Sequence, residues 1–243
     1  MGSTGTSYDQ STERNWRFPD AAWSSDATKH WKEHPELSNI TDWESGLSES
    51  ERKAIHHWIG AGYDDDASQL YTTEWDNLSN DNKQFLSNLY NAVDKFELKK
   101  PIQVNRSTNF RIFGAPSGSY KMSADDVRNF LKNETKGGYL QNDGFMSFST
   151  ETNGVTVAGS GLVIHLQVPP NKGGGAYVSG VGGNHSEREY LVNNNAIFKF
   201  DVKSVRESGG KVHVNAKYVG RSKMQTIDSK NKSRYKKEPN PKF

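Results

Sequence analysis

The sequence of 243 residues contains no cysteine, which excludes disulfide bonds, thiolate metal sites and catalysis by a thiol. It also has little net charge: the formal value of +2 gives no overall field that would favour nucleic acid or a membrane surface as partner. No apolar run approaches the length of a membrane span, and the amino terminus lacks the basic start and apolar stretch of a cleavable signal peptide. We therefore expect a soluble protein without a signal peptide.

Helical patterns come first along the chain. Residues 1–47 are polar but carry scattered aromatic residues, and we expect this lead-in to dock them on a core: Trp16, Phe18, Trp23, Trp31 and Trp43. Ser48 and Glu51 have the spacing of a capping box, so a helix should begin there and stop near Gly60. Apolar residues at helical spacing predict a second helix over 80–96, and a third over 122–134 is capped by Ser123.

Strand patterns dominate the rest of the chain. Alternating or β-branched runs predict strands at 102–107, 144–151, 161–169, 175–180, 188–192, 196–202 and 211–219. Helices followed by short strands favour an α+β domain with a mostly antiparallel sheet, which we place at 48–220. Residues 221–243 contain eight Lys or Arg against two acidic residues and are predicted to be a solvated basic tail.

Three polar clusters lie on the predicted strands. They are Arg106, the pair Ser147 and Ser149, and the pair Glu187 and Glu189. In an extended strand both glutamates would share one face, where carboxylates ~6–7 Å apart repel by a few kcal/mol. Each cluster also has a plain explanation: a surface cation, ordinary strand hydroxyls, and a solvated edge strand protected by negative charge.

Taken together and in this order, the clusters resemble the arginine, serine and glutamate layout of the mono-ADP-ribosyltransferase toxins. This group includes actin-modifying binary toxins such as iota toxin. The similarity covers roughly residues 48–205 and extends to the stretches "SERKAIHHWIGAGYDDDASQL" and "IHLQVPPNKGGGAYVSG". It implies an ADP-ribosyltransferase-like fold, with N-terminal helices packed on a mixed, mostly antiparallel two-sheet β core, and makes 48–220 the catalytic domain.

The resemblance assigns the glutamates to the two partners of the reaction, with NAD as co-substrate. Cleavage of the bond between nicotinamide and ribose passes through an oxocarbenium-like centre, which a carboxylate stabilises. Glu189 would supply that carboxylate and hold the ribose 2′-hydroxyl. Glu187 would orient the acceptor and take its proton.

The same resemblance assigns roles around NAD. Arg106 would pair with the phosphates, because its guanidinium suits a diphosphate. Ser107 would supply a backbone contact to the nicotinamide amide. Ser147 would hydrogen-bond Glu189, and Ser149 would support the strand. Tyr63, as a phosphate contact, and Gly144 complete the predicted NAD-binding set.

Two departures from the family pattern affect these expectations. The serine motif is Ser-Phe-Ser without the usual central threonine, so Ser147 is expected to act as a support. Asn184 replaces the aromatic residue usual in the turn before the glutamates, a turn that contributes to target recognition. The identity of the target protein is therefore left open.

Glutamate at position 187, where Rho-modifying exoenzymes have glutamine, indicates an arginine acceptor on a host-cell protein, with actin as one candidate. No metal is expected. The enzyme would be secreted or injected and would act in the host cytosol. Three alternatives stay open: an NAD glycohydrolase, a phage-encoded transferase that modifies a bacterial host protein, and a non-catalytic binding domain. Nucleic acid is disfavoured as a partner, because aromatic residues are not interleaved with the charges of the tail.

Overall fold

The computed structural model describes residues 34–59, 77–115, 120–142, 144–151, 155–156, 160–181 and 188–221. The helices within these ranges are α3 (Ile40–Ser45), α4 (Glu49–His57), α6 (Asn80–Asp94) and α7 (Ala124–Asn133). Short 3₁₀ turns are η3 (Pro35–Leu37), η7 (Phe110–Phe113) and η9 (Val202–Ser204). The predicted stop at Gly60, four of the five lead-in aromatics and the tail beyond residue 221 lie outside the described residues.

Side-chain caps fix where the helices begin. The Ser48 hydroxyl accepts from the backbone N–H of Glu51, whose carboxylate in turn accepts from Ser48 N at 2.7 Å. Ser123 and Asp126 form the same capping box at the start of α7. These reciprocal bonds satisfy N–H groups that have no partner within the helix. The three helices predicted from sequence are confirmed, each ending within about two residues of the predicted end where that end is described.

The described residues contain twelve strands, and seven of them lie where strands were predicted. They are β1 (Glu97–Leu98), β2 (Ile102–Thr108), β3 (Tyr139–Asn142), β4 (Met146–Ser149), β5 (Val155–Thr156), β6 (Leu162–Val168), β7 (Asn171–Lys172), β8 (Gly175–Tyr177), β9 (Glu189–Val192), β10 (Ala196–Phe200), β11 (Arg206–Ser208) and β12 (Lys211–Arg221). Strands β1 and β7 form a separate ribbon, and the other ten form one sheet. Only the pairs β12–β6 and β2–β5 are parallel among these residues, so the predicted α+β class with a mostly antiparallel sheet is confirmed.

The large sheet consists of two halves. One half has the order β3-β10-β12-β6-β2 and the other has the order β4-β9-β8. Strands β2 and β4 connect them through one register pair, Asn105 opposite Ser149, whereas β2 and β6 share seven such pairs. We call the β2–β4 contact the junction. It brings residues of three strands, β2, β4 and β9, close together.

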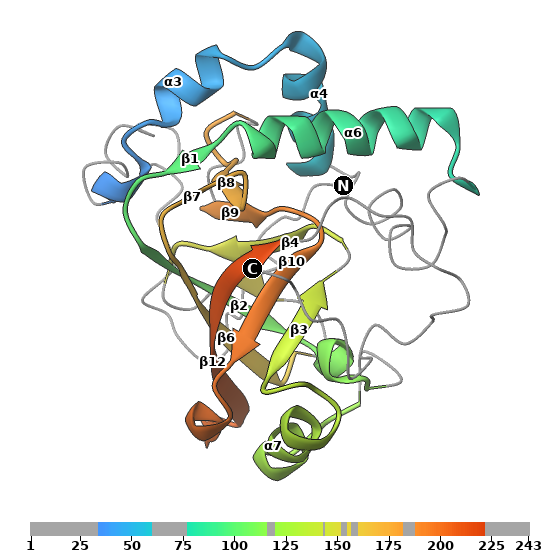
Figure 1. The fold of residues 1–243 in the computed structure, drawn as a ribbon, viewed down its shortest axis with the longest axis vertical. Coiled ribbons are helices and arrows are strands. Elements are labelled where there is room, and N and C mark those ends of the chain that lie inside the picture. The colour runs from blue at the N-terminus through green and yellow to red at the C-terminus, as the bar shows by residue number, and fades with distance from the viewer. Residues whose placement is uncertain are drawn as a thin grey trace.

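The N-terminal helices cover one end of the sheet. In Figure 1, α3, α4 and α6 lie over the end that carries β8 and β9, while α7 lies at the opposite end near β3. Trp43 of α3 is buried, its indole N–H donates to the Ala92 carbonyl at 2.8 Å, and its ring meets the edge of Phe96. The residues just before Ser48 therefore pack on α6. The boundary between lead-in and catalytic domain stays a prediction.

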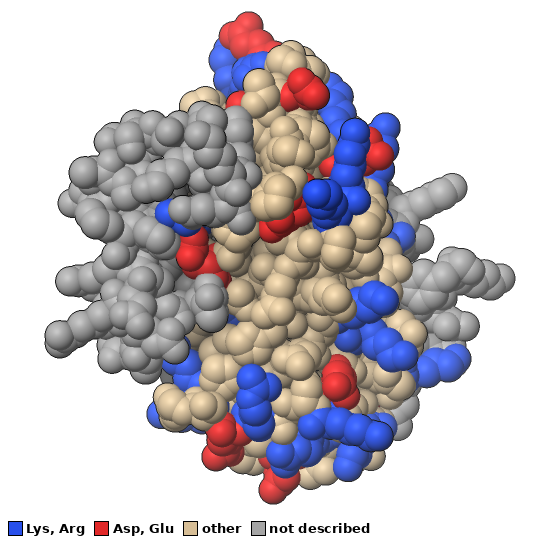
Figure 2. All heavy atoms as spheres, turned by 90° about the vertical axis from the view of Figure 1, so that its left-hand side faces the viewer, with Lys and Arg blue, Asp and Glu red and all other residues tan. Residues whose placement is uncertain are grey.

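Charges on the surface are mixed in sign. On the face shown in Figure 2, basic and acidic side chains are interspersed around a middle zone of uncharged residues. This distribution agrees with the small net charge of the sequence. The tail beyond residue 221, which holds the largest run of basic residues, lies outside the described part.

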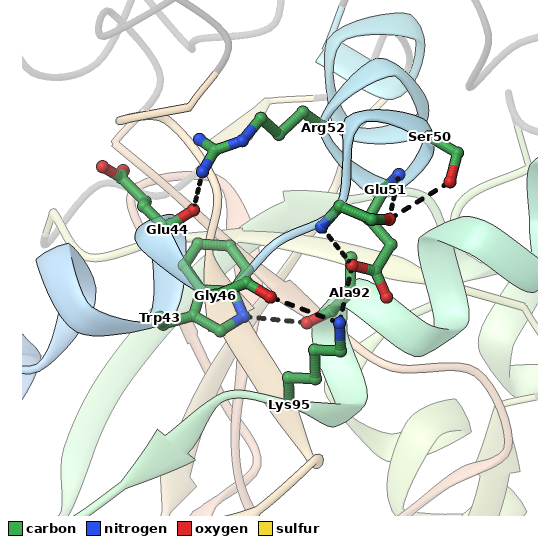
Figure 3. A network of polar contacts seen from close by, with 9 residues as sticks. Trp43, Glu44, Gly46, Ser50, Glu51, Arg52, Ala92 and Lys95 are labelled. Carbon is green, nitrogen blue, oxygen red and sulfur yellow. Dashed lines mark hydrogen bonds and ion pairs between the residues drawn. The ribbon is translucent and has the colours of Figure 1, made fainter.

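A polar network fastens α4 to its neighbours. Lys95, just after α6, forms an ion pair of 2.7 Å with Glu51, which is 6 % exposed, and also reaches the Gly46 carbonyl (Figure 3). On the other side of the helix, Arg52 donates to the Glu44 carbonyl of α3. The Glu51 carboxylate also accepts from the Ser48 N–H in the capping box. One side chain therefore both stabilises the start of this helix and holds it against the end of α6.

Candidate active site

Glu189 lies at the centre of the junction region with both its backbone and its side chain held. It is the first residue of β9 and is 2 % exposed. Its N–H donates to the Ser179 hydroxyl at 2.7 Å, and its carbonyl accepts from Val178 N at 3.0 Å. These two bonds fix the backbone of Glu189 independently of the contacts that its side chain makes.

The Glu189 carboxylate receives donors from a helix and from the neighbouring strand. The indole N–H of Trp58 donates to Oε1 at 2.9 Å, and the Ser147 hydroxyl of β4 donates to the same carboxylate. Burial raises the pKa of Glu189 above its ordinary value, while Ser147, Trp58 and the charge of Arg106 oppose that rise. The result is a dry carboxylate surrounded by groups that favour its charged form.

Arg106 links the two halves of the sheet. It is half-buried on β2, and its Nη1 donates to the Ser147 carbonyl of β4 at 2.6 Å. A guanidinium has five N–H donors in a planar fork, a geometry that suits both a carbonyl and an anion as partners. The structure thus places Arg106, Ser147 and Glu189, which are far apart in the sequence, in one cluster.

The other predicted site residues have more varied surroundings. The Ser149 hydroxyl is buried and accepts from Glu151 N at 3.1 Å. The Ser107 hydroxyl accepts from Lys211 at 3.1 Å, and its side chain points to the sheet face opposite Arg106 because the two are strand neighbours. The Gly144 carbonyl accepts from the amide of Asn142. Glu187 and Tyr63 lie outside the described residues.

The prediction that Glu187 and Glu189 belong to one continuous strand is wrong at the residue between them. Strand β9 begins at Glu189, and Arg188 has a positive φ of 43°, which an extended strand does not allow. The Arg188 carbonyl accepts from Thr150 N at 3.0 Å, and its guanidinium forms an ion pair with Glu151. These contacts stabilise a backbone conformation at Arg188 that the alternating pattern of side chains cannot reveal.

Sequence reasoning missed three contributors to the surroundings of Glu189. Trp58 lies at helical spacing from the apolar Ile55, and nothing in that spacing shows where its N–H would donate. Ser179 lies near the end of the predicted strand 175–180, where a small polar residue has no distinctive signal. The pairing of Glu151 with Arg188 spans 37 residues and follows only from the fold.

The described residues form neither a metal cluster nor a membrane span. No group of three or more His, Asp or Glu side chains is arranged to hold a metal ion there. None of the helices placed by the structure combines the length and the apolar character needed to cross a bilayer.

Solved structures with a similar fold include ADP-ribosylating toxins. The toxin BECa of a C. perfringens binary enterotoxin, solved with NADH, has a TM-score of 0.65 and 22 % identity over 79 % of this chain. Plx2a from Paenibacillus larvae has a TM-score of 0.62 and 22 % identity over 79 % of this chain and 94 % of its own. C3stau2 from S. aureus, solved with NAD, has a TM-score of 0.60 and 15 % identity over 78 % of this chain and 96 % of its own.

These similarities differ in extent. The chain spans about half of BECa, 48 % of its length, but nearly all of the other two proteins. No curated protein matches the chain by sequence. A family model described as ADP-ribosyltransferase exoenzyme matches residues 20–237, which is most of the sequence. The chain therefore belongs to the ADP-ribosyltransferase exoenzyme family, as the order of its arginine, serine and glutamate motifs predicts.

Proposed function

We propose that this protein cleaves NAD at the bond between nicotinamide and ribose and transfers ADP-ribose to an arginine of a target protein. The observation that carries the proposal is the buried carboxylate of Glu189, which faces Arg106 and accepts hydrogen bonds from Ser147 and Trp58. A fixed negative charge in a dry site is suited to a reaction whose transition state develops positive charge on a sugar.

In the proposed reaction NAD is a substrate, and the protein contributes charge, orientation and proton transfer. As the bond from ribose C1′ to nicotinamide breaks, its electron pair leaves with the nicotinamide, and Glu189 stabilises the cation that develops on the ribose. A guanidine nitrogen of the target then forms a bond to C1′. Glu187 accepts the proton that this nitrogen loses, so that charge and atoms balance.

Around this centre we propose the NAD-binding roles implied by the family resemblance. Arg106 would neutralise the diphosphate, and Ser107 would contact the nicotinamide amide through its backbone. Ser149 and Gly144 would support the strand on which Ser147 lies. Tyr63 would add a phosphate contact. Support for this arrangement is the closeness of Arg106 to the Ser147 carbonyl and to Glu189.

The acceptor residue and the place of action are not determined by the fold. Similar folds occur both in binary toxin components and in C3-type enzymes, so the fold does not choose between targets. Glutamate at position 187 favours an arginine acceptor over the asparagine that Rho-modifying enzymes use. We propose a host-cell protein in the cytosol, reached by secretion or injection, and actin is the first candidate to test.

The test compares wild type with Glu189→Gln and Glu187→Gln, using labelled NAD and a host-cell lysate, followed by mass spectrometry of labelled protein. Glu189→Gln should lower both NAD cleavage and transfer by about 100- to 1,000-fold, because the stabilising charge is lost. Glu187→Gln should remove transfer but retain slow hydrolysis of NAD.

Each other outcome has a definite meaning for the proposal. Equal loss of both activities in both variants would contradict the separate roles of the two glutamates. Free ADP-ribose without labelled protein from wild type would identify a glycohydrolase. If wild type consumed no NAD, the binding-domain alternative would replace the enzyme.

A further inference from the structure

The indole of Trp58 is a buried polar contact of Glu189 that the arginine, serine and glutamate motifs do not include. Trp58 is 4 % exposed and Glu189 is 2 % exposed, and their 2.9 Å hydrogen bond joins residues 131 positions apart. A tryptophan on an apolar helical stripe is ordinarily explained by packing alone. Here its single polar atom meets the carboxylate proposed to stabilise the reacting sugar.

Trp58 is held in place from several directions. It follows the last residue of α4, and Trp58 and Ile59 continue that helix in a π-helical turn. The start of that helix is fixed by the Ser48 capping box and by the ion pair between Glu51 and Lys95. The ring itself meets the edge of Phe145, with centroids 5.6 Å apart. Such packing limits rotation of the indole and keeps its N–H directed at Glu189.

The hydrogen bond between Trp58 and Glu189 favours one protonation state of Glu189. An indole N–H can only donate, so its bond to Oε1 favours the carboxylate over the carboxylic acid. The described groups that act with it on Glu189 are the Ser147 hydroxyl on β4 and the charge of Arg106 on β2. Burial works against all three by raising the pKa of Glu189. Each donor therefore matters more than it would in water.

We propose that Trp58 is a positioning residue for NAD cleavage: its N–H fixes the orientation of the Glu189 carboxylate and stabilises its charged form. The inference rests on the proposed function, because it assumes that Glu189 faces the reacting sugar. It adds a residue from the N-terminal helical layer to a site otherwise built from strands β2, β4 and β9. The helices then have a direct chemical role besides covering the sheet.

The first test measures the Glu189 carboxyl directly, by NMR titration of protein labelled with ¹³C at the glutamate side-chain carbonyl, the signal being assigned by its loss in Glu189→Gln. Trp58→Phe keeps an aromatic ring but removes the N–H. In Trp58→Phe the pKa of Glu189 should rise by about one to two units relative to wild type, which corresponds to the loss of one hydrogen bond to a charged group. The acid limb of the pH profile for NAD cleavage should move by the same amount.

Trp43→Phe is the matched control. Trp43 is another buried tryptophan with a hydrogen-bonded indole, but its partner is the Ala92 carbonyl in α6. This variant should lose similar stability and leave the pKa of Glu189 and the pH profile unchanged. If Trp58→Phe fails to fold, benzothienylalanine at position 58 keeps the shape of the indole and replaces only the N–H by sulfur.

The two proposals fail in different ways. An unchanged Glu189 pKa in Trp58→Phe, or a change equal to that in Trp43→Phe, would overturn the role of Trp58 even in a fully active enzyme. If Glu189→Gln cleaved NAD as fast as wild type, the proposed function would be wrong, and Trp58 would be left with a structural bond only.

Discussion

At the scale of single residues, the site combines groups that would be unfavourable in isolation. A buried carboxylate loses its hydration, and this loss raises the pKa of Glu189. Arg188, directly before it, has a positive φ, which non-glycine residues adopt at a cost of about 1 kcal/mol or more. The donors to Glu189 and the ion pair of Arg188 with Glu151 offset these costs. One of the two described non-glycine residues with a positive φ thus lies directly beside the proposed catalytic carboxylate.

Replacing Arg106 by lysine tests its two contacts at once. A lysine is a point charge and cannot bond the Ser147 carbonyl and a phosphate in the fixed geometry of a guanidinium. We expect Arg106→Lys to weaken NAD binding by roughly tenfold, the equivalent of about 1.4 kcal/mol. Calorimetric titration with NAD measures this directly.

Arg111→Lys is the control for that experiment. Arg111 is an exposed arginine on η7, so its exchange should leave NAD affinity unchanged. Equal affinity of Arg106→Lys and wild type for NAD would remove Arg106 from the proposed binding site.

At the scale of elements, helix α4 determines where Trp58, which directly follows it, meets the sheet. Its position depends on its first turn, where Ser48 caps the helix and Glu51 pairs with Lys95. A disturbance at the start of this helix should therefore reach Glu189 through the indole at its other end. The capping box of α7 is its structural counterpart at the opposite end of the sheet.

Replacing the capping serine of α4 or of α7 distinguishes an effect on protein stability from an effect on NAD cleavage. Ser48→Ala and Ser123→Ala should each lower the free energy of unfolding by about 1 kcal/mol, because each leaves an N–H without its partner. Urea unfolding measures that loss. Only Ser48→Ala should also lower the rate of NAD cleavage beyond what the folded fraction explains. Equal activity of the two variants would show that the start of α4 does not influence the site.

The elements also show how far sequence alone leads. The capping boxes and the long strands were predictable because their signals are local: a serine three positions before an acidic residue, or alternating side chains. Strand β3 and helix α3 have no such signal and owe their structure to packing on β10 and α6. The arginine, serine and glutamate motifs could be identified by resemblance. The Trp58 bond and the positive φ of Arg188 depend on contacts between distant segments.

At the scale of the whole molecule, a pair of histidines ties three strands of the larger half together. His165 on β6 contacts Asn105 on β2 at 2.8 Å and His213 on β12 at 3.0 Å, with the two rings stacked. Burial lowers the pKa of His165 to about 4, and the neighbouring His213 and Arg206 act in the same direction. His165 is therefore neutral in the folded protein at neutral pH, whereas an unfolded chain would protonate it near pH 6.5.

This difference makes the fold sensitive to acid. Below pH 6.5 the unfolded state binds more protons than the folded state, so the free energy of unfolding decreases as pH falls toward about 4. Allowing for solvent screening, we expect His165 to account for about 1–2 kcal/mol of that decrease.

Urea unfolding between pH 4 and pH 7 tests this expectation. His165→Gln should show a shallower decrease than wild type, while the same change at the exposed His56 should leave the pH dependence intact. Parallel curves for all three proteins would assign the acid sensitivity to other groups.

The junction has a further consequence for how the protein is made. Between β3 and β10 the chain passes from one half of the sheet to the other and back twice. The smaller half is therefore complete only after β6 of the larger half has been made, and the larger half only after β9 of the smaller half. Arg106 is in place early, but Glu189 joins the sheet through β9, and β12 closes the larger half last. Because such long-range pairings form late and cooperatively, a ribosome-bound or truncated chain should have no partial activity. Catalysis should therefore appear all at once, when the last strand is paired.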